Sequence, residues 1–130
     1  MKRLVLPALA VLLAPLLLSG CIAYHIKDDG TDRAEIGETV IVGGPKVTPL
    51  KLLEDSRCPQ GVQCVWAGQV RIEVRVDLGS RSETRELTLG KGEQVADGTL
   101  TLVEVMPEKR KDTTFYPEDY RFGFRFAGGL

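Results

Sequence analysis

Apolar and polar residues alternate along much of this chain with a period of two, which is typical of β-strands that bury one face. The clearest run is Gln69–Leu78, where the even-numbered residues are Val, Ile or Leu and the odd-numbered residues from Arg71 to Asp77 are charged. A second run, Tyr120–Phe126, places four aromatic side chains on one face and Arg, Gly and Arg on the other. Both runs predict half-buried antiparallel strands with a solvated outer side.

Shorter stretches between these runs have the same extended character. Pro49 predicts an edge position or a bulge in its strand, because proline cannot donate a ladder hydrogen bond. Val103 and Val105 lie out of phase with Leu100 and Leu102, which predicts a bulge or a strand that is covered on both faces. The shorter stretches are Glu38–Val42, Lys46–Glu54, Glu83–Leu89, Gln94–Ala96 and Thr99–Met106.

Turn signals separate these stretches and suggest hairpins. Gly79–Ser82 follows the clearest strand, and Asp97-Gly98 is a favoured dipeptide for a tight two-residue hairpin turn. Outside the first twenty residues, no stretch has a convincing helical period. The sequence therefore predicts an all-β fold, a small antiparallel β-sandwich or barrel of six to seven strands.

Length and charge limit the range of functions. The 130 residues suffice for one domain, and 17 Lys and Arg against 18 Asp and Glu give a net charge of −1. Without a basic field we expect no nucleic-acid partner. The single histidine, His25, argues against a His-rich metal site or a Ser-His-Asp hydrolase.

The N-terminus has the pattern of a cleaved signal peptide. Met1–Arg3 is basic and Leu4–Leu18 is almost entirely apolar, but this run is short for a membrane span and contains two prolines. Leu18-Ser19-Gly20-Cys21 resembles the bacterial lipobox, although a plain signal peptide with an incidental cysteine is an alternative. The predicted division is a signal peptide at 1–20, a lipidated tether at 21–36 and one all-β domain at 37–130.

The lipobox resemblance implies a location in the cell. Cys21 becomes the new N-terminus and carries two or three fatty acyl chains such as palmitate, enough for a stable membrane anchor. Ile22 stands where an aspartate resembles the inner-membrane retention signal, which favours the periplasmic face of the outer membrane in a Gram-negative cell. Apart from this covalent lipid, we expect no cofactor.

The other two cysteines, Cys58 and Cys64, predict a short-range disulfide, because disulfides persist in the envelope and Pro59 and Gly61 turn the chain between them. A metal site that uses both thiols and His25 is the alternative. It is disfavoured because structural zinc sites have four ligands at closer spacing. A redox pair normally has the spacing Cys-x-x-Cys.

The cysteines belong to the segment Asp55–Gly68, with the sequence DSRCPQGVQCVWAG. It resembles an element, D-S-R-C-P-x-x-V-x-C-x-W-A-G, of small bacterial secreted proteins and lipoproteins of no assigned activity. The resemblance covers these fourteen residues and the strand after them. It implies no catalytic residue.

The chemistry of this motif has two interpretations. In both, Asp55 accepts backbone N–H bonds or pairs with Arg57, and Gly68 permits a bulge or a positive φ. In the structural interpretation Trp66 packs on the disulfide or beneath the Arg57 guanidinium. In the functional one, Arg57 and Trp66 are contact residues on a rigid loop.

The long connection 107–119 is the second candidate surface, with Phe115 and Tyr116 as contacts. The leading hypothesis is a lipid-anchored, non-catalytic binding or structural module of the bacterial envelope, with a possible envelope protein as partner. The alternative is a lipoprotein that binds a metal through His25 and the cysteines, or a small ligand inside the sandwich. An enzyme is disfavoured, because no constellation of residues has the spacing that catalysis needs.

Overall fold

A computed structural model describes residues 28–128 of the chain. The predicted signal peptide at 1–20, the predicted lipidation site Cys21 and the single histidine, His25, lie outside the described residues. Within this described part, eight strands and a single 3₁₀ turn, Pro117–Asp119, make up the regular structure. The strands are β1 (Asp32–Glu35), β2 (Val40–Ile41), β3 (Lys46–Asp55), β4 (Val70–Asp77), β5 (Ser82–Thr88), β6 (Gly92–Val95), β7 (Gly98–Met106) and β8 (Arg121–Gly128).

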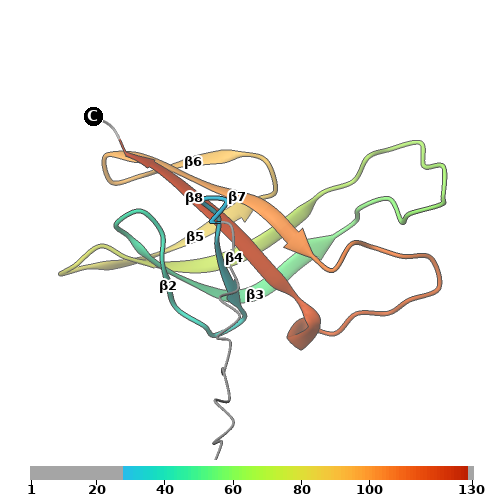
Figure 1. The fold of residues 1–130 in the computed structure, drawn as a ribbon, viewed down its shortest axis with the longest axis horizontal. Helices are drawn as coiled ribbons and strands as arrows, with labels where there is room; N and C mark the ends of the chain where they lie inside the picture. The colour runs from blue at the N-terminus through green and yellow to red at the C-terminus, as the bar shows by residue number, and fades with distance from the viewer. Residues whose placement is uncertain (1–27, 129–130) are drawn as a thin grey trace, which may run out of the picture.

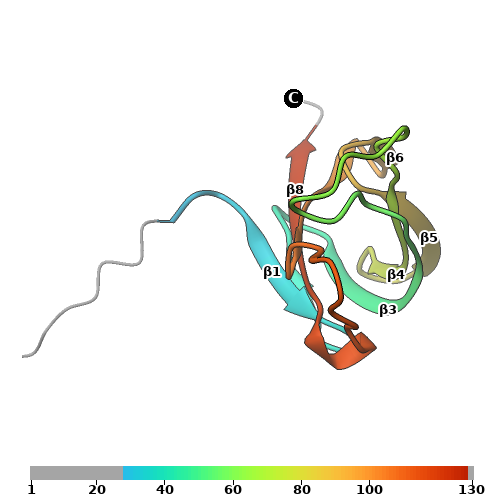
Figure 2. The same ribbon diagram turned by 90° about the vertical axis from the view of Figure 1, so that its right-hand side faces the viewer.

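The strands form two antiparallel four-stranded sheets, in the orders β1-β8-β7-β6 and β2-β3-β4-β5 (Figures 1 and 2). The all-β prediction is confirmed, and the division into two sheets makes the fold a sandwich. The core between the sheets is aliphatic apart from three aromatic side chains of the C-terminal segment. Its largest fully buried members are Phe122, Phe124, Ile72, Leu87, Leu100 and Leu102.

The predicted alternation and both predicted bulges are present. Every apolar side chain of β4 that the pattern placed inward is fully buried. The β3–β4 register shifts between Pro49 and Lys51, and the β7–β8 register shifts between Leu102 and Glu104. The second shift lets Leu102 and Val105 both enter the core in spite of their odd spacing.

The folded domain begins earlier than the predicted residue 37. Asp32–Glu35, within the predicted tether, forms β1 and pairs with β8 in the register Asp32 to Phe124 and Glu35 to Arg121. Ala34 is the only fully buried residue of this strand. A single small apolar residue among charged ones leaves no detectable alternation, so the sequence pattern missed an eighth strand.

The β6–β7 hairpin turns one residue earlier than predicted. Val95 pairs with Gly98, so the two turn residues are Ala96 and Asp97, and Ala96 has a φ of +49°. Gly98 belongs to β7, where a Cβ would lie 2.3 Å from the Ala127 carbonyl oxygen. The glycine is therefore required by close packing against β8, whereas the sequence pattern had assigned it to the turn.

The two ends of the sandwich differ in their connections (Figure 1). At one end the β3–β4 connection, 56–69, and the β7–β8 connection, 107–120, extend beyond the sheets. At the other end only the short turns β2–β3, β4–β5 and β6–β7 join the strands. Both loops singled out in the sequence are thus at the same end, which we call the loop end.

Candidate functional site

An ion pair between Asp55 and Arg57 forms the base of the 55–68 loop. Arg57 Nε lies 2.8 Å from Asp55 Oδ1, and Arg57 Nη2 lies 2.9 Å from Asp55 Oδ2. The backbone N–H of Arg57 also donates to Asp55 Oδ1 at 3.4 Å. The two contacts that the sequence offered as alternatives, an Asx turn and an ion pair, therefore occur together at one carboxylate.

This pair also joins the two sheets. The Arg57 guanidinium donates to the carbonyl oxygens of Val105 at 3.1 Å and Pro107 at 3.0 Å. From the opposite side, the Tyr120 hydroxyl donates to Asp55 Oδ2 at 2.8 Å. The side chains of Arg57 and Asp55 are only 16% and 6% exposed. Arg57 is therefore occupied by internal contacts and is not the exposed contact residue of the functional interpretation.

The ionisation of this cluster follows from its hydrogen bonds. Burial raises the pKa of Asp55, but the hydrogen bonds from Arg57 and Tyr120 outweigh it, and the net pKa is lowered. The hydrogen bond to Asp55 raises the pKa of Arg57. Burial, together with the hydrogen bond to Asp55, raises the pKa of Tyr120 to about 12. At neutral pH the carboxylate and guanidinium are both charged, as a structural ion pair requires, whereas a general acid or base needs a pKa near the working pH.

The disulfide closes the outer part of the loop. Cys58 and Cys64 are bonded, with their Cα atoms 5.9 Å apart, which confirms the predicted pairing. With both thiols oxidised, the alternative metal site that used them has lost its cysteine ligands. In the described part of the chain, no group of three or more His, Cys, Asp or Glu side chains is placed to hold a metal ion.

The 107–120 connection is hydrogen-bonded to the 56–69 connection. The Gln60 N–H donates to the Lys109 carbonyl oxygen at 2.9 Å, within a parallel bridge between Gln60 and Arg110. The Gln60 side-chain amide donates to Glu108. The Lys109 ammonium in turn donates to the Asp55 carbonyl oxygen at 2.7 Å. The connections 56–69 and 107–120 therefore form one tied unit at the loop end.

Gly68 is required where the chain returns to β4. Its φ is +68°, and a Cβ there would lie 1.7 Å from the Ser56 carbonyl oxygen. Ser56 closes the loop by donating its N–H to the Gln69 carbonyl at 2.8 Å, and its hydroxyl accepts from the Gln69 N–H at 2.9 Å. The predicted positive φ is confirmed, and the close approach of the two backbones adds a second reason for glycine.

The tip of the loop is exposed. Val65 and Trp66 are 90% and 83% exposed. The expectation that Trp66 packs on the disulfide or beneath Arg57 is therefore wrong. The physical reason is that Arg57 faces the backbone of the other sheet and the space between the sheets is already filled by residues such as Phe122.

The two aromatic residues of the second loop differ. Phe115 is half-buried and packs edge-on against Tyr120, with ring centroids 6.3 Å apart. The rings of Tyr120 and Phe122 are stacked, with centroids 5.9 Å apart. Phe115 therefore belongs to the aromatic core and not to a contact surface. Tyr116 is exposed, as a contact residue must be. Nothing in the sequence pattern indicates that Tyr120 also holds the Asp55 carboxylate, because alternation does not reveal a partner 65 residues away.

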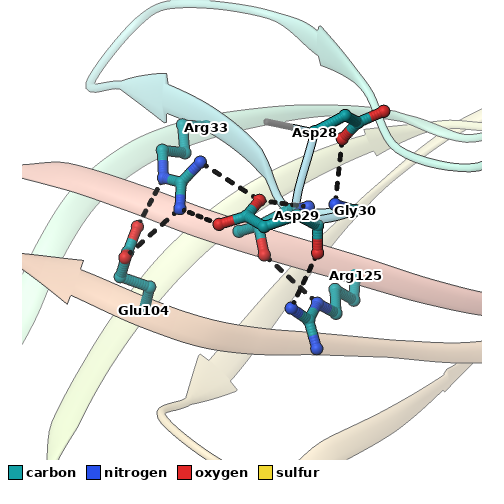
Figure 3. A network of polar contacts seen from close by, with 7 residues as sticks. Asp28, Asp29, Gly30, Arg33, Glu104 and Arg125 are labelled. Atoms are coloured by element: carbon teal, nitrogen blue, oxygen red, sulfur yellow. Dashed lines mark hydrogen bonds and ion pairs between the residues drawn. The ribbon is translucent and has the colours of Figure 1, made fainter. Parts of the chain in front are cut away.

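A polar network holds the chain where it enters the domain (Figure 3). Arg33 donates through Nη2 to Asp29 Oδ2 at 2.7 Å and through Nε to Glu104 Oε2 at 2.6 Å. Arg125 donates to the Asp29 carbonyl oxygen at 3.0 Å. The hydrogen bond from Arg33 lowers the pKa of Asp29 to about 2. These contacts fix residues around Asp29 on the outer face of β7 and β8.

The opposite end of the sandwich contains a cleft of about 460 Å³. It is lined by the turn residues Gly43–Pro45, Asp77–Gly79 and Ala96–Asp97, with Phe126 and Gly128 from β8. The Asp77 carboxylate in this lining accepts a hydrogen bond from Ser82, which lowers the pKa of Asp77. Because Asp77 already has this partner and most of the other lining residues are glycine or apolar, the cleft offers few fixed polar groups to orient a ligand.

Comparisons of the chain with protein-family models, with curated proteins and with solved structures found no match. Among residues 28–128, no helix is long and apolar enough to cross a membrane.

Proposed function

We propose that this chain is a lipid-anchored, non-catalytic binding module of the bacterial envelope, with its contact surface at the tip of the 55–68 loop. The anchor is the acylated Cys21, which the lipobox resemblance implies. The favoured location is the periplasmic face of the outer membrane. The single observation that carries the binding role is the exposure of Val65 and Trp66 on a loop whose base is fixed.

The rigidity of the base is what distinguishes this tip from an ordinary surface loop. The disulfide, the Asp55–Arg57 pair and the Gln60 contacts to the second loop all restrict the backbone before any partner arrives. A preorganised loop loses less conformational entropy on binding than a flexible one. Tryptophan is also among the residues that contribute most to binding energy at interfaces.

A catalytic role has less support. The buried ionisable groups of the loop end, Asp55, Arg57 and Tyr120, are bonded to one another. Each has a pKa displaced away from neutrality, so none is suited to transfer a proton at neutral pH. The alternative of small-ligand binding is best placed at the cleft of the opposite end.

Two measurements on the full chain test the proposal. Radiolabelled palmitate is expected to enter the wild type, and none is expected in Cys21→Ser. For the tip, a photo-cross-linking amino acid placed at Trp66 in envelopes is expected to give adducts with a lipid or a protein. The same group at Ile41 is the control. Ile41 is also apolar and exposed, at 62%, but lies on β2. Equal adducts at both positions, or none at Trp66, would contradict a binding role for the tip.

A further inference from the structure

We infer that the Val65–Trp66 tip inserts into the interfacial region of the same bilayer that holds the lipid anchor. This inference rests on the proposed function and names what the tip binds. Four features support it: the absence of charge in the loop, the cations beside it, the short tether to the anchor and the small size of the tip.

The loop that carries the tip has the composition of an interfacial segment. From Cys58 to Gln69 the sequence contains no Asp, Glu, Lys or Arg, although charged residues make up 27% of the chain. Burying a charged group in an apolar medium is costly, so its absence removes the main barrier to insertion. Tryptophan favours the membrane–water interface, where the ring contacts acyl chains and the indole N–H remains hydrated.

Exposed cations stand beside the loop. The bridge between Gln60 and Arg110 brings Arg110 and Lys111, which are both exposed, next to the 58–64 segment. Of the two acids beside them in the chain, Glu108 already accepts a hydrogen bond from Gln60, whereas Asp112 opposes the two cations. Basic residues near an anionic leaflet are attracted to its headgroups.

The tether is short enough to hold the whole domain, including the loop end, near the membrane. Six residues separate Cys21 from Asp28, and even a fully extended chain between the two spans only about 25 Å. The network around Asp29 then holds the chain on the domain (Figure 3). From there β1 pairs with Arg121–Phe124, the half of β8 that adjoins the loop end. The chain therefore meets the domain near the middle of β8, where Arg125 contacts Asp29 and Thr31, and β1 runs from there towards the loop end.

A protein partner would need more surface than the tip supplies. A stable protein–protein interface buries about 800 Å² on each partner, whereas one Trp and one Val expose a few hundred at most. Interfacial insertion has no such requirement, because the acyl chains of Cys21 already hold the domain at the bilayer. Insertion of the tip then only has to orient the domain on the bilayer.

The chain is well suited to a direct test, because Trp66 is its only tryptophan. The acylated full-length protein is reconstituted in vesicles of phosphatidylethanolamine and phosphatidylglycerol, with and without brominated acyl chains. We expect Trp66 emission at shorter wavelength than in detergent-free buffer, strong quenching by the brominated lipid and a severalfold reduction in quenching by aqueous iodide. The double variant Arg110→Glu/Lys111→Glu should weaken these changes on anionic vesicles but not on zwitterionic ones.

The matched control moves the indole to the other end of the sandwich. In Trp66→Phe/Ile41→Trp the only tryptophan is on β2, beside Lys46 at the end of β3 opposite Asp55. Its emission should stay accessible to iodide and insensitive to brominated lipid. Protein that co-floats with vesicles while Trp66 is as accessible as this control overturns the inference and leaves the lipid anchor intact.

Two further outcomes separate the inference from the proposal on which it rests. Protein that fails to co-float with vesicles after expression in a host that acylates lipoproteins overturns both. Trp66 that becomes shielded only when solubilised envelope proteins are added overturns insertion and supports a protein partner for the same tip.

Discussion

The base and the tip of the 55–68 loop belong to one fourteen-residue motif but have opposite environments. At the base, the side chains of Asp55 and Arg57 are largely buried, paired with each other and hydrogen-bonded to residues of the facing sheet and its loop. At the tip, Val65 and Trp66 are almost fully exposed. The charged residues therefore hold the loop in place while the apolar residues face solvent, which reverses the usual distribution of polar and apolar groups.

This reversal explains how one motif can have both a structural and a functional interpretation. The contacts of the base are internal and fix the direction of the loop, so they support the fold. The exposed tip contributes little to packing and remains available for an external contact. Substitutions at the base and at the tip should therefore affect different properties of the protein.

The largest effect is expected at the base, from Asp55→Ala. It leaves the Arg57 guanidinium without its carboxylate and the Tyr120 hydroxyl without its acceptor. Breaking a buried ion pair at one partner typically costs about 3–5 kcal/mol, which we expect as the loss in the free energy of unfolding measured in urea.

An exposed pair provides the control for Asp55→Ala. Glu35 and Arg121 form an ion pair in which both side chains are 55% exposed. Glu35→Ala should change the free energy of unfolding by about 0.5 kcal/mol or less. Equal effects of the two substitutions would show that the Asp55–Arg57 pair does not hold the base.

The next largest effect is expected from Gly68→Ala. Both Gly68 and Gly61 have a positive φ, at +68° and +76°, but a Cβ meets the Ser56 backbone at the first and nothing within 4 Å at the second. Backbone strain alone costs about 1 kcal/mol at Gly61, and the added clash should bring Gly68→Ala to about 2–3 kcal/mol. Thermal unfolding of the two variants measures the difference. A larger loss for Gly61→Ala would contradict the close approach at Ser56.

A smaller, pH-dependent effect should distinguish the charge of Asp55 from its shape. The pKa of Asp55 is lower in the folded protein than the ordinary value near 4 of an unfolded chain, so the unfolded state takes up the proton first as pH falls. The stabilisation from ionised Asp55 is therefore present above about pH 4 and is lost below it. Melting temperatures of the wild type and Asp55→Asn should converge as the pH falls below about 4. A difference that stays constant as the pH is lowered would rule out the charge as its source.

Most of the fold was predictable from sequence because alternation directly reports which side chains are buried. The β4 and β8 patterns, the bulge at Pro49 and the phase change after Leu102 all have counterparts in the structure. β1 was missed because it buries a single alanine. The hairpin turn lies at Ala96-Asp97 rather than at Asp97-Gly98, because Gly98 is needed in β7, where it packs closely against β8.

The candidate site was only partly predictable, for a different reason. The Asp55–Arg57 pair, the disulfide and the conformation of Gly68 are local and follow from short spacings. The bonds from Arg57 to Val105 and from Tyr120 to Asp55 join segments 48 and 65 residues apart. Alternation gives the buried face of a strand but not its partner in the facing sheet, so neither these bonds nor the resulting exposure of Trp66 could be derived.

The smallest effect on stability is expected at the tip, from Trp66→Ala. An 83% exposed side chain loses little packing when it is truncated, so the free energy of unfolding should change by about 0.5 kcal/mol or less. By contrast, truncation of the buried Phe124 to Ala should cost about 3–5 kcal/mol, which makes it the aromatic control. Urea unfolding followed by circular dichroism compares the two without relying on tryptophan fluorescence. If Trp66→Ala destabilises the protein as much as Phe124→Ala, the indole packs against the domain in solution, and the distinction between a structural base and a free tip fails.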